Sequence, residues 1–274
     1  MVNWIILEQE YASLAIVSEV AGGIYLWEWA ITVYFDWRMF SSFGKGEWRW
    51  TTILYLISRY TTLDAIICIF VFLNLKNEFN CEALIRICAA FGTFALFSSY
   101  VLNSIRMYVD EIKFYNISSE RSSSIAIWKR KLLIVVLVSL TILANAGILI
   151  WVTIDHMGAV WSPLLGGCLI TKTSTDKVQI NFAFACEFLL AVLMLIDIWL
   201  QKGSGRLWQL IYHQGLTWLL IALTFYVPVV VLTWLNLSDA MNMMLQVPLC
   251  IAMSICATRM HRGLYEYAHP DEVI

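Results

Sequence analysis

Charged residues are scarce in this 274-residue chain: Asp, Glu, Lys and Arg make up 14% of it, while hydrophobic residues make up 60%. Ordinary soluble domains contain about a quarter charged and about half apolar residues. A soluble core cannot absorb that excess of apolar side chains, so the composition excludes an ordinary globular protein. The net charge of −2 also lacks the basic excess that binds a polyanion, and no nucleic-acid partner is expected.

Residues that support common chemistries are also missing from the apolar segments. Only four histidines are present, and none is placed to pair with another inside a membrane, which argues against a bis-histidine haem or an intramembrane metal site. No lysine lies in the interior of an apolar stretch, so a retinal Schiff base is excluded. No glycine-rich phosphate loop, nucleophile elbow or His-Glu-x-x-His motif occurs. We therefore expect no catalytic residues, no metal, no cofactor and no enzymatic activity.

What the chain does contain is seven apolar stretches, each long enough to cross the roughly 30 Å of hydrocarbon in a bilayer. Continuous runs of this kind predict helices rather than the alternating strands of a barrel. No linker separates domains, so residues 1–274 are expected to form one all-α membrane domain, a seven-transmembrane-helix bundle. The predicted spans are Tyr11–Trp37, Thr51–Leu73, Leu84–Tyr108, Lys131–Ile154, Val178–Leu200, Leu216–Leu235 and Met241–Met260.

Lys and Arg predict the orientation of this bundle, because cytosolic loops carry the excess of both. Most of the 18 lie in the first, third and fifth loops or in the C-terminal tail. The N-terminus is therefore expected outside and the C-terminus in the cytosol, most readily in the plasma membrane. The opposite set of loops holds only Lys76, Arg86, Lys172 and Lys177.

Two of the seven cysteines differ from the rest. Cys81 and Cys168 are both predicted on the outer side, which is an oxidising compartment where a disulfide can form. The other five fall inside predicted helices, where cysteine usually acts as a small apolar residue. Because these are the only two outer cysteines, a Cys81–Cys168 disulfide is favoured over two unrelated thiols.

Arg59 is the clearest charge inside a predicted span, where a charge needs a partner or a wet cavity. It lies about nine residues, or roughly 13 Å, into its helix. Counted back from the same loop, Glu28 reaches that depth, so a Glu28–Arg59 ion pair is predicted, with Asp36 as the shallower alternative. Such a pair either locks two helices together or has a functional role, and the structural interpretation is favoured.

Other polar residues also fall at membrane depth. They are candidates for a ligand site or polar core, although hydrogen bonding between helices is the simpler interpretation for the asparagines. Glu187 is equally open to both interpretations. Pro228 and Pro248 each remove a backbone hydrogen bond and are expected to kink the sixth and seventh spans. The polar candidates are Asp64, Asn103, Asn145 and Glu187.

A pattern in the first quarter of the chain reads Ile-Tyr-Leu-Trp-Glu-Trp-Ala-Ile-Thr-Val-Tyr-Phe-Asp-Trp-Arg from Ile24, then Ile-Leu-Tyr-Leu-Ile-Ser-Arg-Tyr from Ile53. It resembles the N-terminal signature of the DUF6533 family, seven-helix membrane proteins of basidiomycete fungi. That signature runs Tyr-Asp-Tyr-x-x-Thr-Leu-x-x-Glu-Val, then a leucine-rich run and Asn-Arg-Tyr. The resemblance implies a seven-helix fold and no particular activity. It also suggests that the Glu28–Arg59 pair is a family trait, which favours a structural or switch role for it. Thr32, Arg59 and Tyr60 match the signature; Glu28, Asp36 and Ser58 replace its Asp, Glu and Asn; Cys81 and Arg259 are also similar, and Ser41 departs from an expected Trp.

These features favour a receptor-like protein. An outer ligand, either a small molecule or a peptide, would bias the bundle, and the third and fifth loops would pass the change to a cytosolic signalling protein. A transporter or channel is the alternative, with the four polar candidates lining a path across the bilayer.

Overall fold

The computed structural model describes residues 4–42, 50–74, 80–118, 136, 139–148, 150–151, 158–163, 166–171, 176–201 and 206–268. Residues 139–148 are helical. The remaining elements are α1 (Trp4–Ser42), α2 (Trp50–Asn74), α3 (Cys81–Ser118), β1 (Gly158–Ser162), β2 (Gly167–Thr171), α5 (Asp176–Gln201), α6 (Arg206–Leu235), α7 (Asp239–Met244) and α8 (Gln246–Ala268).

Each of the seven predicted spans coincides with helix in the structure, so the predicted all-α, seven-helix membrane bundle is confirmed. α1, α2 and α3 cover the first three spans, and residues 139–148 lie within the fourth. α5 and α6 cover the next two, while α7 and α8 share the last. Among the described residues, five helical segments are long and apolar enough to cross a membrane by themselves.

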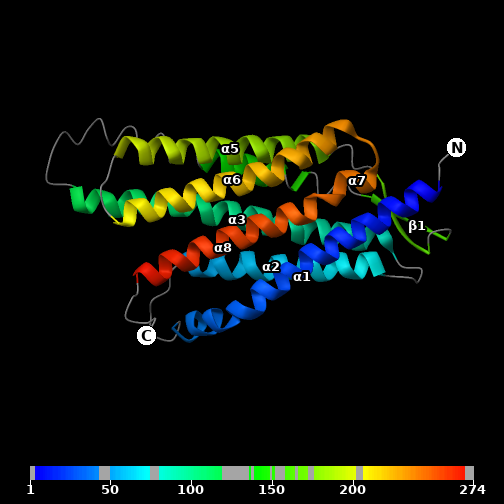
Figure 1. The fold of residues 1–274 in the computed structure, drawn as a ribbon, viewed down its shortest axis with the longest axis horizontal. Helices are drawn as coiled ribbons and strands as arrows, with labels where there is room; N and C mark the ends of the chain where they lie inside the picture. Colours follow the sequence, from blue (N-terminus) through cyan, green and yellow to red (C-terminus); the bar gives the residue numbers. More distant parts are fainter. Residues whose placement is uncertain are drawn as a thin grey trace.

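The helices run side by side along the long axis of the molecule (Figure 1). β1 lies beside the start of α1 at one end, and α8 finishes at the other. α2 packs along α3 and α5 along α6, whereas α8 contacts α1, α2, α3 and α6. α8 is therefore the central helix. In Asp239–Gly263, the membrane-spanning segment formed by α7 and most of α8, the apolar stretch is 50% buried, against 33% or less in the other four spanning segments.

An apolar stripe runs along the outside of α1. Its members are spaced three or four residues apart, which places them on one face of the helix. An exposed apolar surface of this length is unfavourable in water and favourable against lipid. Together with the five spanning segments, the stripe makes this chain an integral, multi-pass membrane protein. The exposed residues include Ile16, Val20, Ile24, Trp27 and Ile31.

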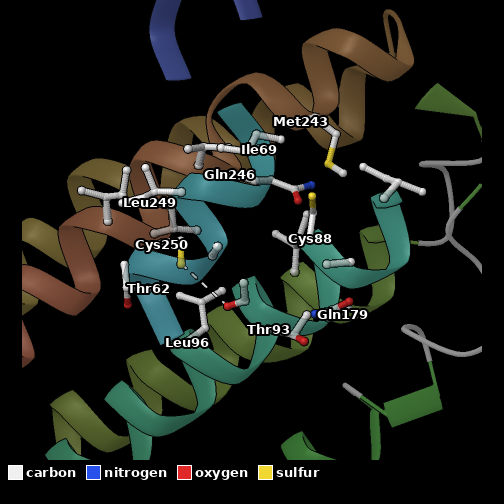
Figure 2. A pocket seen from close by; sticks show the side chains of 18 of the residues that line it. Thr62, Ile69, Cys88, Thr93, Leu96, Gln179, Met243, Gln246, Leu249 and Cys250 are labelled. Atoms are coloured by element: carbon white, nitrogen blue, oxygen red, sulfur yellow. Dashed lines mark hydrogen bonds between the residues drawn. The ribbon is translucent and has the colours of Figure 1, made fainter. Parts of the chain in front are cut away.

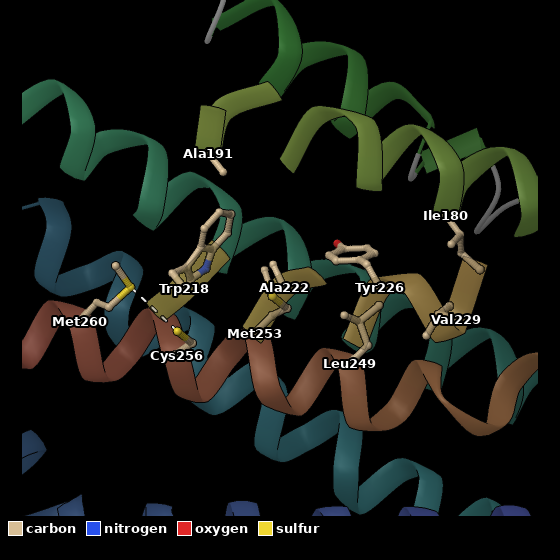
Figure 3. Packing of buried hydrophobic residues seen from close by; sticks show 10 residues of the cluster. All are labelled: Ile180, Ala191, Trp218, Ala222, Tyr226, Val229, Leu249, Met253, Cys256 and Met260. Atoms are coloured by element: carbon tan, nitrogen blue, oxygen red, sulfur yellow. Dashed lines mark hydrogen bonds between the residues drawn. The ribbon is translucent and has the colours of Figure 1, made fainter. Parts of the chain in front are cut away.

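The largest apolar cluster in the described part of the chain lies where α5, α6 and α8 meet (Figure 3). Trp218 is its largest side chain and is 2% exposed. Side chains from α6 and α8 recur every three or four residues, so one face of each helix enters the cluster. Close packing of this kind holds helices together in lipid, where little hydrophobic driving force remains. α6 contributes Trp218, Ala222, Tyr226 and Val229, and α8 contributes Leu249, Met253, Cys256 and Met260.

The seventh predicted span is divided into two helices, because α7 ends at Met244 and α8 begins at Gln246. Pro248 explains the boundary. It has no N–H to donate to the Met244 carbonyl, and its ring is tolerated in the first turn of a new helix. The kink expected at Pro248 is therefore a helix boundary. α6 instead continues through Pro228, and the kink there stays a prediction.

Replacing Ser238 with alanine is expected to lower the free energy of unfolding by about 1 kcal/mol. Ser238 is the N-cap of α7, and its Oγ accepts a hydrogen bond from the Met241 backbone N–H at 3.2 Å. Thermal unfolding of the purified protein in detergent measures the effect. Ser13→Ala is the control, because the Ser13 hydroxyl only donates to the Gln9 carbonyl of its own helix. Equal melting temperatures for the two variants would contradict the capping role.

Candidate functional site

The β1–β2 hairpin is fastened to one end of the bundle. Cys168 in β2 forms a disulfide with Cys81, the first residue of α3, so the predicted disulfide is confirmed. The backbone N–H of Ile170 donates to the Tyr11 hydroxyl of α1 at 2.6 Å. Ile170 is also buried in a cluster with Leu14 of α1. The hairpin is thus attached to both α1 and α3 and covers this end.

Figure 2 shows a cavity of about 150 Å³. It lies next to the hairpin, because Ile170 of β2 is in its wall. Leu14 of α1 lines it too, and the rest of the wall comes from α2, α3, α5, α6, α7 and α8. No Asp, Glu, Lys, Arg or His occurs among the described residues that line it. Most of the lining is aliphatic, and its hydroxyl and amide side chains are Thr62, Thr93, Gln179, Tyr226 and Gln246.

Gln246 brings an unused hydrogen-bond donor to this cavity. Its amide points towards Cys88 in Figure 2, and its Nε2 is buried without a hydrogen-bond partner in the described part of the chain. Nearby, the Cys250 thiol donates to the Gly92 carbonyl at 3.7 Å and joins α8 to α3. A Cβ atom added to Gly92 would meet nothing within 4 Å. Gly92 therefore borders open space.

Buried hydroxyl groups lead away from the cavity along α2. Thr62 Oγ1, in the cavity wall, lies 2.8 Å from Ser254 Oγ of α8 and 2.7 Å from the Ser58 carbonyl oxygen. The Ser58 hydroxyl lies 2.8 Å from that of Ser99 in α3. All four side chains are buried. These contacts join α2, α3 and α8 at one level of the bundle.

Arg59 lies one helical turn before Thr62 on α2, and it is 3% exposed. Its Nε lies 2.8 Å from Asp36 Oδ2, and the two atoms form an ion pair. They do not also form a hydrogen bond. Its Nη2 donates to the Trp29 carbonyl at 2.7 Å and its Nη1 to the Tyr55 hydroxyl at 3.1 Å. The Tyr55 hydroxyl in turn donates to Asp36 Oδ1 at 2.8 Å. This ion pair is therefore surrounded by hydrogen bonds.

The predicted Glu28–Arg59 pair is wrong, and the shallower alternative, Asp36, is the partner of Arg59. α1 does not end at Trp37 as predicted but continues to Ser42. The residues of α1 therefore lie deeper, relative to the loop that follows, than the prediction assumed. Asp36 rather than Glu28 then comes level with Arg59.

Glu28 instead binds two arginines of α8. Arg259 donates to both of its carboxylate oxygens, at 3.0 Å from Nε and 2.5 Å from Nη2, and Arg262 donates to Oε1 at 2.5 Å. The Glu28 side chain is 8% exposed, while that of Arg259 is 64% exposed. His261, between the two arginines in sequence, stacks on the Tyr55 ring with centroids 5.0 Å apart. We call the Asp36–Arg59–Tyr55 and Glu28–Arg259–Arg262 groups together the ionic clusters.

The four polar-core candidates do not come together at the cavity. Asp64 is exposed on the outside of α2, so its placement in the core is wrong. Asn145 and Glu187 are buried, and neither Asn145 Oδ1 nor Glu187 Oε2 has a hydrogen-bond partner among the described residues. The side chain of Asn103 lies outside the described part of the structure. Among the described side chains, Asp64, Asn145 and Glu187 do not line the cavity.

Comparison with known proteins adds little. No protein-family model matches the chain, and no curated protein matches it. The crystal structure of squid rhodopsin superposes with a TM-score of 0.46 at 13% identity, covering 96% of this chain and 86% of that one. A superposition this loose assigns no ligand, pigment or signalling partner.

The sequence did not predict two features of the site: the binding of Glu28 by Arg259 and Arg262, and the unpaired amide of Gln246 in the cavity. The sequence prediction places Arg259 and Arg262 among the basic residues of the C-terminal tail and assigns neither a partner, although Arg259 is also similar to the DUF6533 family. Their spacing of three residues places both on one helix face, which is the signal that a shared partner was available. Gln246 carried no such signal, because nothing local shows that a glutamine amide will lack a partner.

Proposed function

We propose that this protein is receptor-like: a ligand in the cavity changes the packing of α2 and α8, and the change reaches the ionic clusters and the cytosolic loops beyond. The observation that carries the proposal is the chain of contacts from the cavity wall to those clusters. Thr62 lines the cavity, and Arg59 lies one turn away on the same helix.

The same helices form both regions, which allows one to affect the other. α8 lines the cavity with Cys250, contacts Thr62 through Ser254, and holds Glu28 through Arg259. The Tyr25 hydroxyl of α1 also donates to the Arg59 carbonyl at 2.6 Å. Packed elements of this kind move between discrete arrangements rather than deforming gradually. A ligand shifts such an equilibrium only as far as its affinities for the two arrangements differ.

The proposed orientation places the hairpin outside and the end of α8 in the cytosol. It is supported by the excess of Lys and Arg in the first, third and fifth loops and in the tail. The disulfide-linked hairpin agrees with an oxidising outer compartment. On this basis we propose the plasma membrane as the location and the basic third and fifth loops as the docking region for a cytosolic signalling protein.

A transporter or channel is less well supported. It needs a continuous polar path, yet Asp64 is exposed on the outside of α2 and neither Asn145 nor Glu187 lines the cavity. The described part of the candidate path is therefore interrupted. We propose no catalytic activity and no cofactor for this chain.

We also propose membership of the DUF6533 family, on the resemblance of the N-terminal signature. The matched positions belong to one network: Asp36 pairs with Arg59, and Glu28 accepts from the α8 arginines. The Thr32 hydroxyl donates to the Glu28 carbonyl at 2.6 Å, and Ser58 contacts Ser99. The signature is then a set of contacts between α1, α2, α3 and α8.

Filling the cavity is expected to change the distance between the cytosolic ends of α1 and α8. Spin labels on Ser41→Cys and Glu266→Cys, both at exposed positions, report that distance by pulsed electron resonance in lipid nanodiscs. Gly92→Leu fills the cavity without a backbone clash. We expect its distance distribution to differ from that of the labelled parent, because the filled cavity repacks α2 and α8.

Glu28→Gln serves as the positive control, because it weakens the contact between α1 and α8 directly. Protein without the two added cysteines controls for labelling of the native thiols. If Glu28→Gln changes the distribution while folded Gly92→Leu reproduces that of the parent, the cavity does not communicate with the clusters and the receptor-like proposal fails.

A further inference from the structure

We infer that the cavity binds an uncharged, mainly apolar small molecule whose oxygen atom accepts a hydrogen bond from the Gln246 side-chain amide. The inference rests on the proposed function in taking this cavity as the ligand site. It goes beyond that function by naming the chemistry of the ligand and the residue that recognises it.

The lining decides the charge of the ligand. The described residues around the cavity include no Asp, Glu, Lys, Arg or His. Two buried acids of α1 nearby are already paired, Asp36 with Arg59 and Glu28 with Arg259. An ion placed in the cavity would lose its hydration without gaining a counter-ion. Ammonium, carboxylate and phosphate groups are therefore disfavoured, and so is a peptide with charged termini.

The unused amide donor decides where the polar atom of the ligand lies. Gln246 Nε2 is buried without a hydrogen-bond partner in the described part of the chain. Two other polar groups in the wall already use their hydrogens: Thr93 donates to the Ala90 carbonyl and Cys250 to the Gly92 carbonyl. A buried donor left without an acceptor is unfavourable. A carbonyl, ether or hydroxyl oxygen on the ligand satisfies it.

The volume of the cavity limits the size of the part of the ligand that it can enclose. Dry cavities of about 150 Å³ with aliphatic and aromatic walls hold a molecule the size of benzene. This cavity also has a volume of about 150 Å³. A six-membered ring bearing one oxygen fits these requirements, and so does the equivalent end of a longer molecule.

Three probes of nearly equal size separate the requirements. Cyclohexanone carries an acceptor and no charge, methylcyclohexane carries neither, and cyclohexylammonium carries a charge. Binding to the purified full-length protein is measured by ligand-observed NMR, with the signal from Gly92→Leu subtracted to remove partitioning into detergent. We expect cyclohexanone to bind about threefold to tenfold more tightly than methylcyclohexane, the effect of one hydrogen bond. Cyclohexylammonium is expected to bind most weakly.

Two variants test the recognition. Gln246→Leu is expected to remove the preference for cyclohexanone while methylcyclohexane still binds, because the cavity remains and only the donor is lost. Gly23→Leu is the matched control for Gly92→Leu: a Cβ there also meets nothing within 4 Å, but Gly23 lies on the exposed surface of α1. It is expected to bind all probes like the parent.

The inference is overturned if cyclohexylammonium binds best or if Gln246→Leu keeps the preference for cyclohexanone. It is also overturned if the folded protein binds bulk lipid and none of the three probes. Failure of the receptor-like proposal looks different. In that case the probes follow the expected order, yet cyclohexanone leaves the distance between the labels at positions 41 and 266 unchanged.

Discussion

Replacing Arg59 with methionine is expected to lower the free energy of unfolding by about 3–5 kcal/mol, the usual cost of removing one partner from a buried ion pair. Asp36 would then be a buried charge without its ion-pair partner, and among the described residues the Tyr55 hydroxyl would still donate to it at 2.8 Å. Methionine keeps much of the length of the arginine side chain, so the loss reflects charge more than volume. Denaturation of the purified protein in detergent micelles measures the change.

Two further variants make this expectation specific. The double variant Arg59→Met with Asp36→Leu is expected to recover most of the loss, because apolar replacements of buried pairs are often neutral. Arg86→Met makes the same substitution in the exposed Arg86–Glu82 pair, whose side chains are 47% and 55% exposed. That change is expected to cost about 0–1 kcal/mol. A double variant as unstable as Arg59→Met would show that the pair is not what stabilises this region.

Removing the disulfide with Cys168→Ser is expected to cost about 2–5 kcal/mol. Cys81 and Cys168 are 87 residues apart, so the bond closes a long loop in the unfolded chain. In the folded variant, the described contacts that still hold the hairpin over the cavity are the Tyr11–Ile170 hydrogen bond and apolar packing. Probe binding is expected to weaken with stability, because the wall that includes Ile170 is no longer fixed.

A reducing agent gives an independent measurement of the same bond. It is expected to lower the melting temperature of the parent to that of Cys168→Ser and to leave the variant unchanged. Cys186→Ala removes a buried free thiol and is the matched control, which should respond to the reductant as the parent does. A parent protein that keeps its melting temperature after complete reduction would contradict the stabilising role.

The arrangement along the membrane normal could be read from the sequence, because hydropathy follows the position of the bilayer directly. The seven spans and the pairing of Cys81 with Cys168 both depend on that one coordinate. Pairing within the bundle depends on two more properties, the length of each helix and the face it turns inward. α8 continues to Ala268, so Arg259 and Arg262 lie on a helix rather than in a tail.

The cavity could not be predicted for a related reason. Its lining comes from helices far apart in the chain, so no local pattern marks it. Asp64 shows the opposite error. Its charge within a predicted span made it a candidate for the polar core, but α2 places it on the outside of the bundle. Gln246 became a candidate only when its neighbours were known, since an amide without a partner is defined by what is absent around it.

The Glu28 contacts also have a consequence for biosynthesis. Glu28 is separated from Arg259 by 231 residues and from Arg262 by 234. At ribosomal rates of about 5–20 residues per second, its carboxylate waits on the order of 10–50 s for these partners. Asp36, by contrast, meets Arg59 as soon as the second helix emerges. A ribosome that stops before α8 therefore releases a chain with an unpaired acid in its first helix, which distinguishes it from a finished one.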